Sequence, residues 1–306
     1  MSVAHDAITV SVEREKLAIF LGNYESGSAE WLELREGAGV VTGTLFGTIC
    51  GLNPWESAFT AWAKATGKIP NEVRKSRPMR LGQLLESPIR QIWSEENPEY
   101  LVEYDLGTWS HDEYDWARAN PDGFITYPDG VKGILEIKTA RVPFEEVPAH
   151  YKAQVLWYMW VFGLTRAKLV ALFSGNDLQT FDIEWDAFEF QAMFSRVMVW
   201  RDHVLEEKKP EWDGSASTYE TVKALNTGAN DTAVELGDLG IHLSNAQSDL
   251  DKATENLTKL KSITLDNLGD AKYGYVDVNG EQVTVAVRSV NKNGIVSLTV
   301  KKGKNV

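Results

Sequence analysis

The segment 119–140, ANPDGFITYPDGVKGILEIKTA, constrains the fold more than any other, because it predicts a β-hairpin that carries charged residues. The tripeptide Pro-Asp-Gly occurs in it twice, at 121–123 and at 128–130. Pro-Asp-Gly is a common turn sequence, and residues 124–127 and 131–138 on either side of the second copy have the composition of strands. The second copy is therefore predicted to form the tip of the hairpin.

The register of this hairpin places the first copy opposite the second strand. With Asp129 at the centre of the turn, the numbers of facing residues add up to 258, so Asp122 faces Glu136. Facing side chains lie on one side of the sheet, with Cβ atoms about 4.5–5.5 Å apart. Lys138 shares that side because side chains alternate along a strand. The hairpin thus brings two carboxyl groups and one ammonium group together.

The residues alone leave two interpretations of this charged group. Close carboxylates repel each other unless a cation lies between them, and Mg²⁺ or Mn²⁺ with oxygen ligands suits the pair, with the Ile137 carbonyl as a further ligand. Lys138 beside such a metal would position a water or stabilise charge during attack on phosphorus. Alternatively, Asp122, Glu136 and Lys138 form a charge cluster on a solvated sheet face, although their apolar neighbours favour a half-buried strand.

Composition divides the chain of 306 residues near position 212. All 11 Trp and all 11 Phe lie at or before Trp212, and the aromatic residues beyond it are Tyr219, Tyr273 and Tyr275. Helical and strand-like patterns are mixed before that point, so we expect an α/β fold with a mixed central sheet flanked by helices. The predicted parts are an N-terminal segment 1–27, a core 28–212, a linker-like region 213–240 with room for one short helix, and a C-terminal extension 241–306.

Periodicity and turn residues predict the individual elements. Helices are expected over 28–34, 54–66, 79–96, 148–163 and 186–208, and strands over 167–174, 179–185, 273–278, 282–289 and 295–301. From Leu243 to Leu260, apolar residues recur at spacings of three and four, which predicts a helix with one apolar stripe. This stripe either packs on the protein's own body or contacts another subunit or a partner.

The net charge of −13 argues against a general nucleic-acid coat protein, whose affinity would come from Lys and Arg. Basic residues are nevertheless concentrated over 64–80, a segment that either contacts a polyanion or is a solvated face. They are Lys64, Lys68, Arg74, Lys75, Arg77 and Arg80.

Cysteine and histidine content limits the metal chemistry. The single Cys50 excludes an intrachain disulfide and a Cys-only zinc or iron–sulfur site, and the five His have no metal-ligand spacing. Oxygen ligands are therefore expected for any metal. The longest apolar run, 155–164, is too short to span a bilayer and the N-terminus has no signal-peptide pattern, so a cytoplasmic protein is expected.

Four ordered blocks resemble the phage lambda exonuclease and YqaJ-like viral recombinase family of the PD-(D/E)xK nuclease superfamily. They are MRLGQLLE (79–86), NPDG (120–123), LEIK (135–138) and YKAQVLWYMWV (151–161). The resemblance covers roughly residues 28–208 and implies a restriction-endonuclease-like fold. Residues 214–306 have no counterpart in lambda exonuclease.

The resemblance also assigns roles around the hairpin. Asp122, Glu136 and Glu86 match the carboxylates that hold one or two Mg²⁺ ions, and Lys138 matches the lysine near the attacking water. On the following helix, Gln154 matches a glutamine that braces the active site. Tyr151 is a weaker match, which we assign to DNA contact together with the basic segment.

A further stretch, residues 31–51, resembles the part of the family that holds the 5′-phosphate of a DNA end through an arginine and a hydroxyl group. Arg35 and Thr44 match these two residues. Thr44 stands where a serine is usual, and the segment between the two positions is longer than in lambda exonuclease.

The resemblance implies a metal-dependent exonuclease that degrades the 5′-ended strand of linear duplex DNA and leaves 3′ tails for recombination. It also implies a homotrimeric ring around DNA and a single-strand annealing protein as partner. Two alternatives remain open at this point. An endonuclease of the same superfamily would cut closed circular DNA, and a non-catalytic DNA-end-binding assembly factor would bind without cleaving.

Overall fold

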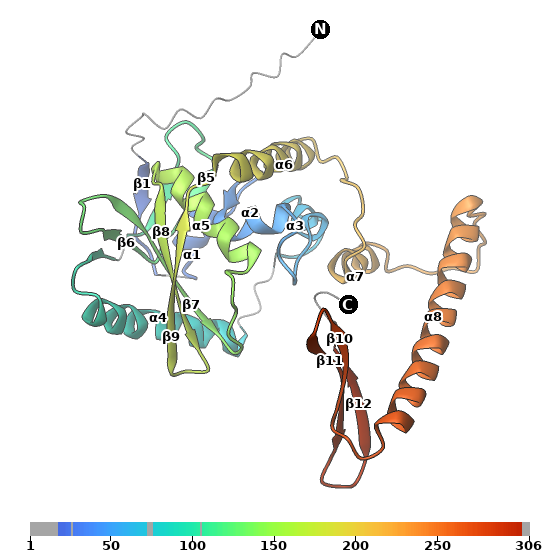
Figure 1. The fold of residues 1–306 in the computed structure, drawn as a ribbon. Helices are drawn as coiled ribbons and strands as arrows, with labels where there is room; N and C mark the ends of the chain where they lie inside the picture. The colour runs from blue at the N-terminus through green and yellow to red at the C-terminus, as the bar shows by residue number, and fades with distance from the viewer. Residues whose placement is uncertain (1–17, 26, 72–75, 105, 302–306) are drawn as a thin grey trace. The chain divides into compact units, whose positions relative to one another are not determined.

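The computed structural model describes residues 18–25, 27–71, 76–104 and 106–301, which form two compact units (Figure 1). The N-terminal unit ends at Gly228 and the C-terminal unit begins at Ala229. Two residues of the predicted basic segment, Arg74 and Lys75, lie outside the described ranges. Within these ranges no helix is long and apolar enough to cross a membrane.

A five-stranded mixed sheet with the order β3-β6-β7-β8-β9 forms the centre of the N-terminal unit. Its strands are β3 (Leu101–Glu103), β6 (Gly123–Thr126), β7 (Lys132–Ala140), β8 (Arg166–Phe173) and β9 (Asp177–Glu184). Strands β7 and β8 run parallel and the other neighbours antiparallel. Helix α5 (Ala149–Phe162) connects β7 to β8, as a parallel pair requires. The expected fold class, a mixed central sheet flanked by helices, is confirmed.

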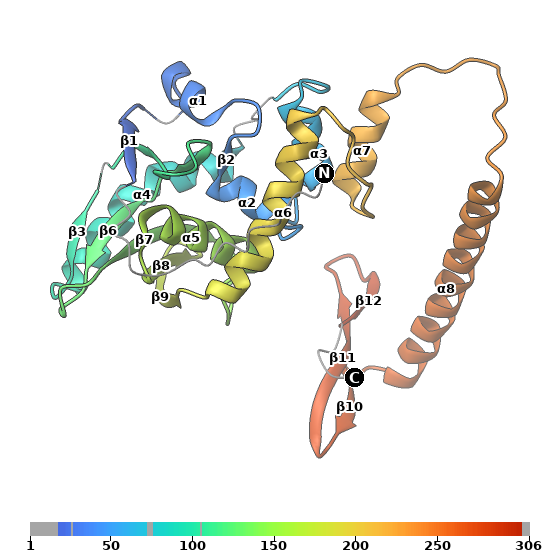
Figure 2. The same ribbon diagram turned by 90° about the horizontal axis from the view of Figure 1, so that it is seen from above.

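Helices cover both faces of this sheet, as Figure 2 shows from above. On one face, α4 (Arg77–Glu96) packs through Ile89 and Trp93. The other face carries α5, and around it pack α2 (Gly43–Ile49), α3 (Ala58–Ala65) and α6 (Ala187–Leu205). Helix α5 is apolar on all sides, which suits a helix enclosed by other elements. It ends at Gly163, whose left-handed φ of 64° favours glycine.

A second sheet, with the order β1-β4-β5-β2, was not predicted. Its strands are β1 (Ile19–Gly22), β2 (Val41–Thr42), β4 (Thr108–Ser110) and β5 (Ala117–Ala119). They are too short to show the alternation of apolar and polar residues by which a strand is recognised in sequence. Because β1 pairs with β4, part of the predicted N-terminal segment 1–27 belongs to the folded unit. Helix α1 (Ala29–Arg35) follows β1 and agrees with the prediction.

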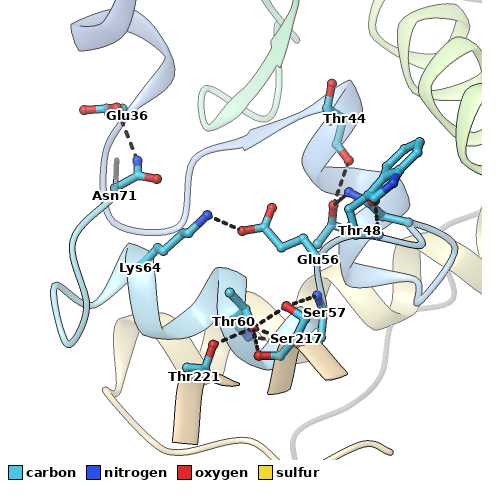
Figure 3. Close-up of polar contacts among 12 residues, drawn as sticks. Glu36, Thr44, Thr48, Glu56, Ser57, Thr60, Lys64, Asn71, Ser217 and Thr221 are labelled. Atoms are coloured by element: carbon cyan, nitrogen blue, oxygen red, sulfur yellow. Dashed lines mark hydrogen bonds and ion pairs between the residues drawn. The ribbon is translucent and has the colours of Figure 1, made fainter. Parts of the chain in front are cut away.

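The linker-like region 213–240 is in part folded, which revises the predicted end of the core at 212. Helix α7 (Ala216–Leu225) lies within it and packs against α3, so the compact unit extends to Gly228. Hydroxyl groups join the two helices (Figure 3), since Thr60 Oγ1 lies 2.8 Å from both Ser217 Oγ and Thr221 Oγ1. Contacts between small polar residues have no apolar pattern, which explains why the sequence resembled a linker.

The C-terminal unit consists of a long helix and an antiparallel sheet, in agreement with the prediction. Its elements are α8 (Asp238–Leu268), β10 (Tyr273–Val278), β11 (Glu281–Val290) and β12 (Val296–Val300), and the strand order is β10-β11-β12. The apolar stripe from Leu243 to Leu260 lies on α8, and the strands of the same unit do not bury it. The sheet instead contacts the C-terminal end of α8, where Leu268 lies beside Gly274.

Candidate active site

The hairpin β6–β7 has the predicted register. Phe124 faces Ile134 and Gly123 faces Leu135, so the numbers of facing residues add up to 258 as expected. The second Pro-Asp-Gly forms the turn, where the Val131 N–H donates to Asp129 Oδ1 at 3.1 Å and Gly130 adopts a φ of 82°. The first copy ends with Gly123, the first residue of β6, and its Asp122 is therefore opposite Glu136.

Asp122 and Glu136 lie together on the face of the sheet that α5 covers. The backbone N–H of Ile137 donates to Asp122 Oδ2 at 2.8 Å, which joins the first Pro-Asp-Gly to β7. The Glu136 side chain is only 1% exposed. Its neighbours on this face of the strand are the apolar Ile134 and the cationic Lys138. The solvated charge cluster considered above therefore does not describe this site.

Lys138 is the cation of this group. Its Nζ donates to Glu136 Oε1 and lies 5.3 Å from the centre of the Tyr151 ring, so Lys138 lies between Glu136 and Tyr151. Burial opposes the charge of Lys138, but Glu136 and Asp122 together raise its pKa above the ordinary value. Lys138 is thus held as an ammonium ion beside two carboxyl groups.

The single positive charge of Lys138 does not balance the two carboxyl groups of Asp122 and Glu136. Burial, followed by the proximity of Asp122, raises the pKa of Glu136 to about 8. Burial also raises the pKa of Asp122, against the opposing effects of Lys138 and the Ile137 N–H. Glu136 Oε2 is buried and accepts no hydrogen bond from any described residue. An unpartnered carboxyl oxygen beside a second carboxyl group fits a divalent cation with oxygen ligands.

Glu86, the third predicted metal ligand, lies on α4 and does not join the other two directly. Its Oε1 lies 3.7 Å from Arg90 Nη1, and Arg90 in turn donates to the backbone oxygen of Asp122 at 3.4 Å. Glu86 is close enough to contribute to the raised pKa of Glu136, as the weakest of several causes. Over the ranges that the structure describes, no three His, Cys, Asp or Glu side chains form a ready-made metal cluster.

Helix α5 adds Gln154 and a residue that the sequence analysis missed, Tyr158. Gln154 Nε2 donates to the Tyr158 hydroxyl at 2.9 Å. Burial, and then the charge of Glu136, raise the pKa of Tyr158, so its hydroxyl is within electrostatic range of Glu136. Helix α2 packs closely on both, since a Cβ at Gly43 would lie 2.7 Å from Tyr158 Cε1. The spacing of four residues, which puts 154 and 158 on one helix face, was the available sequence signal.

Arg35 is located at the edge of this site, at the end of α1. Its Nη1 donates to Asn120 Oδ1, two residues before Asp122, and its guanidinium carbon lies 4.2 Å from the centre of the Trp31 ring. Burial lowers the pKa of Arg35, while the neighbouring Tyr158 opposes this effect. Thr44 is exposed in the first turn of α2, next to Gly43. Arg35 and the start of α2 thus both lie near Tyr158.

The described part of the basic segment has two environments. Lys64 pairs with Glu56 at 2.6 Å (Figure 3), and Lys68 pairs with Glu207 at 3.4 Å. Arg77 and Arg80 are exposed in the first turns of α4, the helix that carries Glu86. These two arginines are absent from the ion pairs formed among the described residues.

Two solved structures of nucleases have similar folds. The alkaline exonuclease LHK-Exo from Laribacter hongkongensis is 18% identical and has a TM-score of 0.48, and the similarity covers 66% of this chain and 100% of that one. A phage-related exonuclease from Haemophilus somnus 129PT is 14% identical with a TM-score of 0.42, covering 55% and 95% of the two chains.

Sequence comparison identifies the family. Residues 30–167 match the model of the YqaJ-like viral recombinase domain. The protein YqaJ of Bacillus subtilis (strain 168) is 31% identical over 219 residues, which are 68% of this chain and 66% of YqaJ. The chain thus spans just under two thirds of the length of this relative. The matched residues include the hairpin with Asp122, Glu136 and Lys138 and the helix with Gln154 and Tyr158. The chain belongs to the YqaJ-like viral recombinase family.

Proposed function

We propose that this protein is a metal-dependent exonuclease that hydrolyses phosphodiester bonds of linear duplex DNA. The observation that carries the proposal is the buried pair Asp122 and Glu136 with Lys138, in which Glu136 Oε2 has no partner among the described residues. A buried pair of carboxyl groups is costly to the protein unless it serves a cation. Membership of a recombinase family supports DNA as the substrate.

Asp122 and Glu136 would hold Mg²⁺ or Mn²⁺, one or two per site, with Glu86 and the Ile137 carbonyl as further ligands. A divalent ion bound here would supply an activated water and neutralise charge on the phosphate. Lys138 places its ammonium group beside these ligands, where it holds the water or stabilises the negative charge that develops on phosphorus. Gln154 and Tyr158, joined by a hydrogen bond, fix the helix face behind the carboxylates.

We further propose that the 5′-ended strand is degraded, leaving a 3′ single strand. Arg35 is bonded to Asn120 beside the first Pro-Asp-Gly, so a terminal phosphate bound by Arg35 and Thr44 would lie next to the carboxylates. Tyr151, together with the basic residues at the start of α4, would contact the duplex. A homotrimeric ring, a single-strand annealing partner and a cytoplasmic place of action rest on the family resemblance alone.

The test uses the protein and its Lys138→Ala variant with linear and closed circular duplex DNA, each strand end labelled separately, with Mg²⁺ or EDTA. We expect Mg²⁺-dependent loss of 5′ labels from linear DNA, and a decrease in rate of at least about a hundredfold in the variant. Lys132→Ala is the matched control, since Lys132 lies on the same strand but is exposed and paired with Glu103 at 3.0 Å.

Other outcomes would replace this proposal by one of its alternatives. Cutting of closed circles would identify an endonuclease. Loss of 3′ labels would contradict the assignment of Arg35 and Thr44 to a 5′-phosphate. Tight binding of DNA ends without cleavage in any divalent metal would identify a non-catalytic assembly factor.

A further inference from the structure

The sheet of the C-terminal unit differs in charge from the rest of the chain. The described residues 272–301 contain four Lys or Arg, of which Arg288 pairs with Asp270 at 3.4 Å, and two acidic residues, although the whole protein has a net charge of −13. Of the described basic residues, Lys272 and Lys301 are exposed at the ends of β10 and β12. The acidic residues, Asp277 and Glu281, lie around the turn between β10 and β11. Lys272 therefore lies at the end of the sheet opposite this turn, whereas Lys301 lies beside Val285, midway along β11.

The two faces of this sheet have different environments. Gly274 and Ala286 face each other across β10 and β11, and Ala286 is 4% exposed. A Cβ at Gly274 would lie 3.4 Å from Leu268 of α8, so this is the covered face. Tyr273 and Tyr275 alternate with Gly274 and are 56% and 55% exposed. Both rings therefore lie on the uncovered face, with their Cα atoms about 6.6–6.8 Å apart along the strand.

Polar and cationic groups continue this face across the sheet. Val287 faces Tyr273 on one side and Thr299 on the other, which places an exposed hydroxyl group across from the first ring. Lys301 donates its N–H to the Val285 carbonyl, so it follows Thr299 on the same face and lies across β11 from Tyr275. Lys272 Nζ lies 5.0 Å from the centre of the Tyr273 ring.

This combination of groups fits one class of ligand. Exposed aromatic rings two residues apart on a sheet stack on unpaired bases, and nearby Lys side chains bind the phosphates between them. A duplex hides the faces of its bases and offers nothing to the rings, whereas an acidic peptide would use the lysines alone. We propose that the uncovered face of the β10-β11-β12 sheet binds single-stranded DNA, with Tyr273 and Tyr275 stacking on bases and Lys272 and Lys301 contacting phosphates.

The stacking surface does not depend on the nuclease assignment. That its ligand is DNA, and that this DNA is the strand left by degradation, rests on the proposed function. A surface of this kind in the same chain would retain the single-stranded product after the complementary strand is removed.

The first experiment measures binding of a fluorescein-labelled oligothymidylate to the full-length protein in EDTA, by fluorescence anisotropy. We expect Tyr273→Ala and Tyr275→Ala each to raise Kd by about ten- to a hundredfold, because base stacking on an aromatic side chain contributes about 1–3 kcal/mol. Tyr273→Phe keeps the ring and should bind as the unchanged protein does. Tyr219→Ala is the matched control, since Tyr219 is an exposed tyrosine on α7. Unchanged Kd values in both alanine variants would overturn the proposal.

A second variant leaves the rings intact. Lys301→Glu should weaken binding and reduce the slope of log K against log salt by about 0.7 for each lost phosphate contact. Lys252→Glu on α8, where Lys252 is exposed and only 3.5 Å from Asp249, should leave the slope unchanged. An equal slope for Lys301→Glu and the unchanged protein would contradict the phosphate contact.

Two further measurements separate this proposal from the proposed function. Oligonucleotide binding should survive in Lys138→Ala, because Lys138 is not part of the β10-β11-β12 sheet. If the unchanged protein binds oligonucleotide through Tyr273 and Tyr275 but never cleaves DNA, the binding surface stands and only its role in retaining the product of degradation is lost. Competition by unlabelled duplex as effective as that by the single strand would overturn the preference for unpaired bases.

Discussion

The carboxyl groups of Asp122 and Glu136 are held together on neighbouring strands where little water reaches them, and a single ammonium group stands beside them. The metal-free protein therefore keeps like charges in proximity, which lowers its stability. Such destabilising groups are typical of functional sites, where residues are kept for activity at a cost in stability.

Asp122→Asn should relieve this repulsion. The amide oxygen can still accept the hydrogen bond of the Ile137 N–H, and the pair of Glu136 and Lys138 stays intact. We expect the free energy of unfolding in EDTA to rise by about 1 kcal/mol, which corresponds to about 2–4 °C in Tm. Thermal unfolding followed by circular dichroism would measure this.

The same variant should lose the response to metal. If Mg²⁺ or Mn²⁺ binds the folded state alone, as the proposed function requires, the Tm of the unchanged protein should rise with metal concentration. In Asp122→Asn this rise should disappear. An equal metal-dependent rise in both proteins would show that the ions bind elsewhere.

Tyr158→Phe tests the residue that the sequence analysis missed. The substitution removes the hydroxyl that accepts from Gln154 Nε2 at 2.9 Å but keeps the ring that packs beside Gly43. We expect the rate of a single turnover to fall about tenfold, since the loss of one buried hydrogen bond costs about 1–2 kcal/mol, while KM stays close to its original value. A change in Tm without any change in rate would make Tyr158 a packing residue only.

The positions of individual residues were predicted correctly where a rule for neighbouring residues in the chain applied. A turn of known type fixed the register, and the register fixed the pairing of Asp122 with Glu136. Contacts between distant segments follow no such rule. The bond of Arg35 to Asn120 and the contact of Lys138 with Tyr151 depend on how α1 and α5 pack, which the residues alone do not determine.

At the scale of elements, long and strongly patterned segments were predicted and short or polar ones were not. Strands β6, β7, β8 and β9 of the central sheet and helices α4, α5, α6 and α8 agree with the expected segments, because turn residues or periodicity make them recognisable. Strand β3, with three residues, was not predicted. The four-stranded sheet was missed because its strands have two to four residues. Helix α7 was placed in a linker because hydroxyl groups, not apolar side chains, dock it.

Thr60→Val tests the docking of α7 on α3. Thr60 Oγ1 lies within 3.1 Å of two oxygen atoms of Ser217 and within 2.9 Å of Ser57 Oγ, and valine removes these contacts without changing the shape of the side chain. We expect a loss of about 1–3 kcal/mol in the free energy of unfolding, because partners are left buried without hydrogen bonds. Urea unfolding would measure it.

The control is Thr66→Val at the end of the same helix. Thr66 Oγ1 bonds only backbone carbonyls of its own helix, at Trp62 and Ala63, so its loss should cost much less. Equal losses in the two variants would mean that α7 contributes nothing to the stability of the N-terminal unit.

At the scale of the whole molecule, the proposed function requires an acidic protein to bind an acidic polymer, so positive charge has to be concentrated where the DNA would lie. The sequence located one such concentration at 64–80, but it could not show which of these side chains are neutralised by the fold. The structure pairs Lys64 with Glu56 and Lys68 with Glu207. Lys68 and Glu207 are distant along the chain, so the sequence gives no sign of this pair. Arg77 and Arg80 stand exposed on α4, in the first turns of the helix that carries Glu86.

This difference predicts how salt will affect duplex binding in EDTA. Each phosphate contact that is lost should lower the slope of log K against log salt by about 0.9. Arg77→Ala with Arg80→Ala should therefore lower the slope by about two, whereas Lys64→Ala with Lys68→Ala should change it little, because these ammonium groups already have carboxylate partners. Filter binding over a range of NaCl concentrations would measure both slopes. An equal decrease for the two pairs would mean that DNA displaces Glu56 and Glu207 from the lysines. An unchanged slope for the arginine variant would mean that the duplex does not contact the start of α4.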